Sequence, residues 1–131
     1  YGQAKDPVNQ TGMVAHNVAT GELILTGPDA LTEDMPVLDV RTPGEYAAGH
    51  MPNSLNIPHT QLRDRLDEVR AWVDENAGGQ PFVVMCAAGV RSWIGYRIVR
   101  AAGFDVTMLS GGIQTLRAWL GDRAATVLLT E

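Results

Sequence analysis

The sequence predicts an α/β fold, a single domain in which a parallel sheet of about five strands carries helices on both faces. The first observation behind this prediction is that short apolar runs alternate with segments of helical periodicity from residue 36 onward. The second is that these runs are continuously apolar, as in parallel strands that are buried on both faces. The third is size, because 131 residues, of which 45% are hydrophobic, suffice for one core and are few for two.

The first 35 residues precede this alternation. Asp6 and Pro7 are typical of a helix N-cap and a first helical position, and they predict a helix that ends near Gly21. Residues 22–35 are predicted to be a connector, with Leu23-Ile24-Leu25 as a short strand candidate within it.

The first buried strand and the helix after it are predicted at residues 37–48. Val37-Leu38-Asp39-Val40 is a short apolar run of the kind that forms a buried strand. Thr42, with Glu45 three residues later, forms a capping box and marks a helix start. The helix is short, because Gly49-His50-Met51-Pro52 ends it.

Three further strand–helix units follow. Their strands are predicted at residues 54–57, 82–85 and 106–109, and their helices from 59 or 60 to about 76, from 92 to about 103, and from 112 to about 120. Pro58, Gly78-Gly79 and Gly111-Gly112 separate these elements. Residues 122–131 are predicted to be a C-terminal tail, in which Thr126-Val127-Leu128-Leu129 forms either a strand or part of the tail.

The composition restricts the partners. Fifteen acidic residues against ten Lys and Arg give a net charge of -5, so we expect neither a nucleic acid nor an anionic membrane as a partner. No apolar run reaches the roughly 18 residues of a membrane span, and no basic-then-apolar leader is present. A single cysteine can form no internal disulfide and is typical of a reduced, cytoplasmic protein. Because the first residue is Tyr1 rather than Met, we expect a processed product or a piece of a longer protein.

Cys86, the only cysteine, lies where a catalytic thiol would be placed. The strand predicted at 82–85 leads into it and a helical pattern begins at Ser92, so the thiol occupies a turn at the carboxyl end of a strand. In open parallel sheets, ligands bind at such ends. The unpaired N–H groups and the dipole of a helix N-terminus favour an anion there, and a thiolate, a sulfur oxyanion and a phosphate are all anions.

The residues after Cys86 form a predicted substrate-binding loop. Gly89 permits backbone geometry that is closed to other residues, and the small Ala87 and Ala88 leave the loop floor open. The backbone N–H groups of residues 87–91, Val90 included, are expected to surround the sulfur and to raise the thiolate fraction. Arg91 supplies a fixed positive charge and paired donors for an oxyanion.

Two reactions fit a cysteine in such a loop, namely sulfur transfer through a persulfide and phosphate ester hydrolysis through a phosphocysteine. Cysteine-dependent phosphatases have five residues between the Cys and the Arg, whereas four separate Cys86 from Arg91. The shorter loop favours a terminal sulfur over a phosphate group. The structural alternative is that Cys86 is simply a small buried apolar residue.

Three segments of the chain resemble the rhodanese family of sulfurtransferases, over about residues 36–120. The segments are Leu38 to Tyr46 with Gly49 to Pro58, Val83 to Ser92, and Leu109 to Ile113 with Trp119. The resemblance implies a rhodanese-like domain at residues 36–121 and a transferase activity of the thiosulfate sulfurtransferase type. It also implies that Cys86 is the catalytic residue, that the substrate is a small sulfur compound, and that no metal is needed.

The first of these segments holds a predicted polar cluster. Asp39, Arg41, Glu45 and His50 can pin the loop after their strand beside the Cys86 loop. Together with Ser92, they are expected to support the site through structural ion pairs and hydrogen bonds. The alternative is that His50 or Asp39 takes part in proton transfer.

Residues 1–9 carry a second resemblance. Tyr1-Gly2-Gln3-Ala4-Lys5-Asp6-Pro7-Val8-Asn9 is similar to the end of the dimerisation domain in flavin-dependent pyridine-nucleotide disulfide reductases, most closely the coenzyme A disulfide reductase group. This implies that residues 1–21 are a helix left from an upstream dimerisation domain and that a flavin reductase domain lies in the same polypeptide. FAD, NAD(P)H and coenzyme A are then implied for the full-length oxidoreductase, and no cofactor for this chain. Alternatively, residues 1–21 are a packing helix of the domain.

The expected function is the transfer of sulfane sulfur as a Cys86 persulfide, from thiosulfate, a persulfide or a polysulfide to a thiol or cyanide. The alternative from another class is a non-catalytic rhodanese-like domain with a regulatory or redox-sensing role. Trp93 and Tyr96 follow the loop, and they either line its mouth or pack inside the fold.

Overall fold

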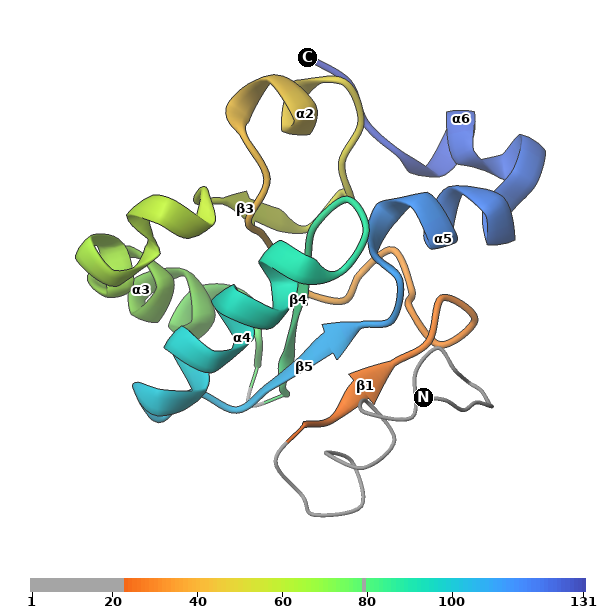
Figure 1. The fold of residues 1–131 in the computed structure, drawn as a ribbon. Helices are drawn as coiled ribbons and strands as arrows, with labels where there is room; N and C mark the ends of the chain where they lie inside the picture. Colours follow the sequence, from red (N-terminus) through yellow and green to blue (C-terminus); the bar gives the residue numbers. More distant parts are fainter. Residues whose placement is uncertain (1–22, 79) are drawn as a thin grey trace.

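The computed structural model describes residues 23–78 and 80–131, which form a parallel five-stranded sheet with helices on both faces (Figure 1). The predicted α/β class and the parallel sheet are confirmed. The helix predicted to end near Gly21 lies outside the described residues. The strands are β1 (Leu25–Thr26), β2 (Val37–Asp39), β3 (Ser54–Asn56), β4 (Phe82–Met85) and β5 (Val106–Leu109).

The order of the strands, β1-β5-β4-β2-β3, creates a switch point between β2 and β4. The chain passes from β2 to β3 on one side of the pair, and from β4 to β5 on the other side. The connections that follow β2 and β4 therefore diverge, and in open α/β sheets ligands bind at such a switch point. Cys86 follows β4, and Arg41 follows β2 by two residues, so the topology brings both to this switch point.

Helices cover the sheet on both sides. In Figure 1, α3 and α4 lie on one side of the strands and α5 and α6 on the other, while α2 lies beyond the end of the sheet. The helical elements are α2 (Pro43–Ala47), η1 (His59–Arg65), α3 (Leu66–Asn76), α4 (Val90–Ala101), α5 (Gly112–Leu120), η2 (Gly121–Arg123) and α6 (Ala124–Val127). No helix among residues 23–78 and 80–131 is both long enough and apolar enough to cross a bilayer.

The core has one apolar cluster on each face of the sheet, because successive strand residues point to opposite faces. Leu38, Val84 and Cys86 belong to the cluster beneath α3 and α4. Val37, Val83 and Met85 belong to the cluster beneath α5. Cys86 therefore continues the row of side chains that faces α4, and its sulfur points toward the start of that helix.

The helices differ from prediction mainly at their starts. The capping box of Thr42 and Glu45 is confirmed, and α2 begins directly after it. Helix α4 begins at Val90 rather than at Ser92, because Gly89, with a φ of 120°, turns the chain straight into the helix. The helix predicted from residue 59 or 60 starts instead as the tighter 3-10 turn η1, which has no side-chain cap at Pro58, and becomes α-helical at Leu66.

The two ends of the described chain also differ from prediction. The strand predicted at residues 23–25 is displaced to Leu25–Thr26, since Leu25 pairs with Met108 and the strand lies at the edge of the sheet. Residues 124–127 form α6, and Leu129 makes an isolated antiparallel bridge with His50. The open choice between strand and tail at residues 126–129 is thus resolved as a helical turn followed by a single bridge.

Gly112→Ala is predicted to destabilise the fold strongly, because a Cβ at this position would lie 2.5 Å from the carbonyl oxygen of Ala87. Its φ of 70° is also costly for any residue with a side chain. Gly121→Ala is the matched control, since Gly121 has a φ of 57° and open space around it. In urea denaturation, Gly121→Ala should cost about 1–3 kcal/mol and Gly112→Ala should cost clearly more. Equal losses would show that the close approach is unimportant.

Candidate functional site

Cys86 lies at the carboxyl end of β4, with 1% of its surface exposed. The N–H of Gly89 donates a hydrogen bond of 3.0 Å to the Cys86 Sγ. Gly89 is also the N-cap of α4, so the sulfur lies against the positive end of a helix of twelve residues. The predicted position of the thiol, in a strand-to-helix turn that faces a helix N-terminus, is confirmed.

The loop between β4 and α4 is held from outside by the start of α5. The N–H of Ile113 donates to the Cys86 carbonyl at 2.8 Å, and the N–H of Gln114 donates to the Ala87 carbonyl at 3.0 Å. Gly112 allows this approach, because a side chain there would collide with both carbonyls. The carbonyl groups at the start of the loop are therefore directed toward α5 and away from the sulfur.

The rest of the loop leaves its amide groups available. Among the described residues, the N–H groups of Ala87, Ala88, Val90 and Arg91 donate to no backbone carbonyl. Ala88 and Val90 are exposed, and Ala87 and Gly89 are partly exposed. An anion that enters the loop would thus meet several N–H donors that are not engaged by backbone carbonyls.

Arg91 lies in the first turn of α4 and is paired with Glu45 of α2. Its two terminal nitrogens contact the two carboxylate oxygens at 2.7 and 2.9 Å, which is a bidentate ion pair. The Arg91 hydrogen bonds lower the pKa of Glu45 from its ordinary 4.5 to about 2, and Thr42 contributes to the same shift. The pKa of Arg91 is raised, chiefly by Glu45 and to a lesser extent by the charge of Cys86. The Arg91 N–H groups that were predicted to bind an oxyanion are therefore largely engaged by Glu45. The positive charge of Arg91 remains close to the thiol.

Asp39 and Arg41 form a buried ion pair after β2. The Arg41 Nη2 lies 2.7 Å from the Asp39 Oδ2, and the side chains are 4% and 0% exposed. Arg41 also donates to the carbonyls of Glu45 at 3.2 Å and of Gly49 at 2.7 Å. Since most of its donors are satisfied in this way, the buried charge is well compensated. The pair therefore holds the backbone of the α2 segment, residues 42–49, at Glu45 and at Gly49.

His50 fastens the C-terminal tail to the α2 segment. Its ring stacks on Tyr46, with centroids 3.8 Å apart, and its Nδ1 lies 2.8 Å from the Tyr46 carbonyl. Its Nε2 lies 3.5 Å from a carboxylate oxygen of Glu131, and its backbone pairs with Leu129. These contacts join His50 to Tyr46 and to the C-terminal tail, and among the described residues no hydrogen bond joins its ring to Asp39, Arg41 or Glu45, the other members of the predicted polar cluster.

Ser92 is fully buried in the first turn of α4, and its hydroxyl has no hydrogen-bond partner among the described residues. Sequence reasoning marked Ser92 as a support residue but could not show that its hydroxyl is unpaired. It did not predict that Tyr46 and Glu131 contact His50, nor that the α5 amides hold the carbonyls of the Cys86 loop. The paired glycines at 111 and 112 were the available signal for the α5 contact, because they allow a close approach of backbones.

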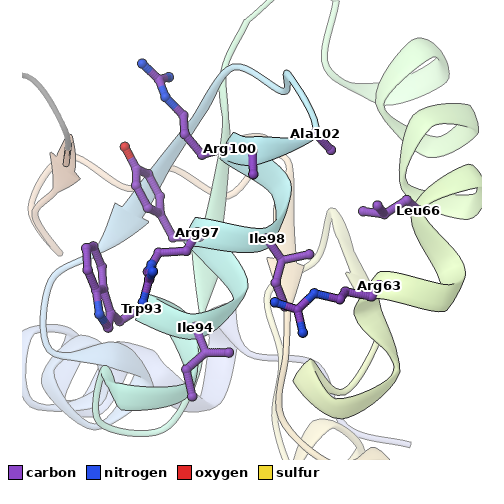
Figure 2. A pocket seen from close by; sticks show the side chains of 10 residues that line it. Arg63, Leu66, Trp93, Ile94, Arg97, Ile98, Arg100 and Ala102 are labelled. Carbon is purple, nitrogen blue, oxygen red and sulfur yellow. The ribbon is translucent and has the colours of Figure 1, made fainter.

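Trp93 and Tyr96 line a groove on α4 that does not include Cys86. The groove, of about 800 Å³, is lined mainly by α4, and Arg63 and Leu66 are contributed by η1 and α3. Figure 2 shows Arg63 and Leu66 on the side of Ile98, whereas Trp93 lies on the other side of α4. Tyr96 is 1% exposed, so it packs inside the fold as well.

Comparison with known proteins agrees with this geometry. The family model described as "Rhodanese-like domain" matches residues 27–118. A sulfurtransferase from Allochromatium vinosum is 32% identical over 83 residues, which cover 63% of this chain and 71% of the relative. A tRNA 2-selenouridine synthase from Azotobacter vinelandii is 29% identical over 125 residues, but only 34% of its length is covered.

Two solved structures resemble this chain over most of its length. The reduced Bacillus anthracis CoADR-RHD has a TM-score of 0.73 and 30% identity, and the match covers 94% of this chain and 22% of that one. An NAD-dependent persulfide reductase from A. fulgidus has a TM-score of 0.64 and 34% identity, with 88% and 20% covered. This chain therefore corresponds to about a fifth of each of these two proteins, and to less than half of the first curated relatives that it matches.

The Glu45–Arg91 pair predicts a pH dependence of stability. Because folding lowers the pKa of Glu45 from 4.5 to about 2, the pair stabilises the fold fully above about pH 5, and the stabilisation is lost as the pH falls toward 2. Between pH 5 and 2.5, the free energy of unfolding should fall more for the natural chain than for Glu45→Gln. The difference should be about 1 kcal/mol or less, since Glu45 is partly exposed.

Chemical denaturation at several pH values measures this difference. Glu75→Gln is the matched control, because Glu75 is an exposed carboxylate on α3. Its stability should follow the natural chain over the whole range. If Glu45→Gln follows the natural chain equally closely, the ion pair does not stabilise the fold.

Proposed function

Because this chain belongs to the rhodanese-like domain family, we propose that it is a sulfurtransferase that carries sulfane sulfur as a persulfide on Cys86. The observation that carries the proposal is the hydrogen bond of 3.0 Å from the Gly89 N–H to the Cys86 Sγ. It lies in a loop whose first carbonyls face α5 and whose other amides donate to no backbone carbonyl among the described residues. Such a loop stabilises negative charge on a sulfur atom at the place where the reaction creates it.

In the first half-reaction, the Cys86 thiolate attacks the outer sulfur of a donor such as thiosulfate. A new S–S bond forms, the S–S bond of the donor breaks, and sulfite leaves with the electron pair. No external oxidant is consumed. The N–H groups of Ala87, Ala88, Val90 and Arg91, which donate to no backbone carbonyl, would bind the terminal sulfur, which carries the negative charge of the persulfide.

In the second half-reaction, a thiolate or cyanide attacks the terminal sulfur, and the Cys86 thiolate leaves. The kinetics are therefore expected to be of the ping-pong type. The charge of Arg91 favours the thiolate in both steps and attracts anionic donors, while Glu45 holds the guanidinium at the edge of the loop. A reducing compartment such as the cytoplasm would keep Cys86 available between turnovers.

We further propose that the chain acts as a module of a larger disulfide or persulfide reductase. The two reductases similar over 88% and 94% of this chain support this proposal. FAD, NAD(P)H and coenzyme A would then be bound by the flavin reductase part of the same polypeptide, outside this chain. The sulfur donor or acceptor would be a persulfide that the reductase part handles.

Cys86→Ala is predicted to abolish sulfur transfer from thiosulfate to cyanide, by at least about a thousandfold, because the sulfur carrier is lost. Mass spectrometry of the natural chain after thiosulfate treatment should show a gain of one sulfur atom, which cyanide removes. Sulfur transfer that survives in Cys86→Ala would refute the mechanism.

The same experiment separates the alternatives. If thiosulfate, persulfides and polysulfides all fail to load the natural chain, a regulatory or redox-sensing role of Cys86 is supported instead. Hydrolysis of an aryl phosphate by the natural chain, lost in Cys86→Ala, would indicate a phosphatase.

A further inference from the structure

The hydroxyl of Ser92 is buried without a partner next to the sulfur site. Ser92 is 0% exposed, and its Oγ makes no hydrogen bond with any described residue. Burying a hydroxyl without a partner is unfavourable, because its hydrogen bonds to water are lost and not replaced. An alanine would fill a similar space at no such cost. The unpaired hydroxyl therefore needs an explanation, and one explanation is that it is paired when the site is in another state.

The contacts of Gly95 indicate which end of β4 Ser92 faces. One turn further along α4, a Cβ on Gly95 would lie 3.1 Å from Val40 and 3.3 Å from Val84. Ser92 and Gly95 lie on the same face of the helix, because they are three residues apart. Ser92 lies about 4.5 Å from Gly95 along the helix axis, toward the N-terminus of α4.

A similar displacement along β4, toward its carboxyl end, leads from Val84 toward Cys86. A strand advances about 3.3 Å per residue, and residues two apart point to the same face. Val84 and Cys86 belong to the same apolar cluster, on the face that α4 covers. Because α4 returns along the strand that precedes it, moving toward its N-terminus means moving toward the carboxyl end of β4. The Ser92 side chain therefore faces the end of β4 where the sulfur lies.

We propose that Ser92 donates a hydrogen bond to the Cys86 Sγ when this atom is a thiolate. A neutral thiol is a weak acceptor, and it already receives the Gly89 N–H. A thiolate is a strong acceptor with room for a second donor, and rotation about the Cα–Cβ bond of Ser92 swings the hydroxyl toward it. The hydroxyl that is unpaired in the thiol state is thus paired in the reactive state.

This inference rests on the proposed function and adds a catalytic residue to it. The thiolate occurs twice in the cycle, as the nucleophile that breaks the S–S bond of the donor and as the leaving group when the acceptor takes the terminal sulfur. In both steps the electron pair resides on Sγ, and Ser92 stabilises it there without itself losing its proton. Ser92 should therefore accelerate both half-reactions.

Ser92→Ala tests the proposal. The pH dependence of Cys86 alkylation by iodoacetamide should shift to higher pH by about one unit, as expected for the loss of a hydrogen bond to a charged group. At neutral pH, both half-reactions should slow by about tenfold. The charged groups around the site, namely Arg91 on α4, Glu45 on α2 and the Asp39–Arg41 pair after β2, are unchanged in this variant.

Thermal unfolding supplies a readout that separates this role from a structural one. Since the hydroxyl is unpaired in the thiol state, Ser92→Ala should unfold at the same temperature as the natural chain or at a higher one. Ser110→Ala is the matched control, because Ser110 follows the neighbouring strand β5. It should leave the alkylation profile unchanged.

An unchanged alkylation profile in Ser92→Ala would overturn the proposal, and so would a variant that fails to fold, because the hydroxyl would then be structural. Alkylation requires no sulfur donor. If the natural chain accepts no sulfur while Ser92→Ala still shifts the profile, the proposed function fails and the interaction between Ser92 and Cys86 stands.

Discussion

The two hydrogen bonds from the start of α5 to the carbonyls of Cys86 and Ala87 determine the chemistry of the loop. They point the first carbonyl oxygens of the loop away from the sulfur, and they need the close approach that Gly112 allows. With these carbonyls turned outward, the N–H of Gly89 can face the Cys86 Sγ and the start of α4 can stabilise negative charge. The site is therefore built from peptide groups whose direction is set before any substrate arrives.

The loop after β2 provides the second support. The Asp39–Arg41 pair holds the α2 segment at its Glu45 and Gly49 carbonyls, and Glu45 holds Arg91 of α4. These contacts join the carboxyl ends of β2 and β4, the adjacent strands between which the topology switches. A series of contacts thus leads from the buried carboxylate of Asp39, through Arg41 and Glu45, to Arg91 at the edge of the Cys86 loop. The C-terminal tail contacts the same segment at His50, through Leu129 and Glu131.

Local patterns in the sequence were sufficient for the fold and for the place of the thiol. Continuous apolar runs predicted the central strands, and Thr42 with Glu45 predicted the start of α2, because each signal depends on residues near in sequence. The pairing of Glu45 with Arg91 joins residues 46 positions apart, and it appears only when both loops meet at the switch point. The unpaired state of the Ser92 hydroxyl likewise depends on every neighbour in the packed core.

The outward-turned carbonyls have a consequence for metal binding. Thiolates attract soft cations such as Cu(I) and Zn²⁺, which need further electron-pair donors to complete their coordination. Rotating the first peptide groups of the loop to offer their oxygens would break the bonds to Ile113 and Gln114 and leave two amides unpaired. The loop therefore presents hydrogen atoms rather than lone pairs to whatever approaches the sulfur. A cysteine that attracts metal ions by its own chemistry is in this way left open to anions instead.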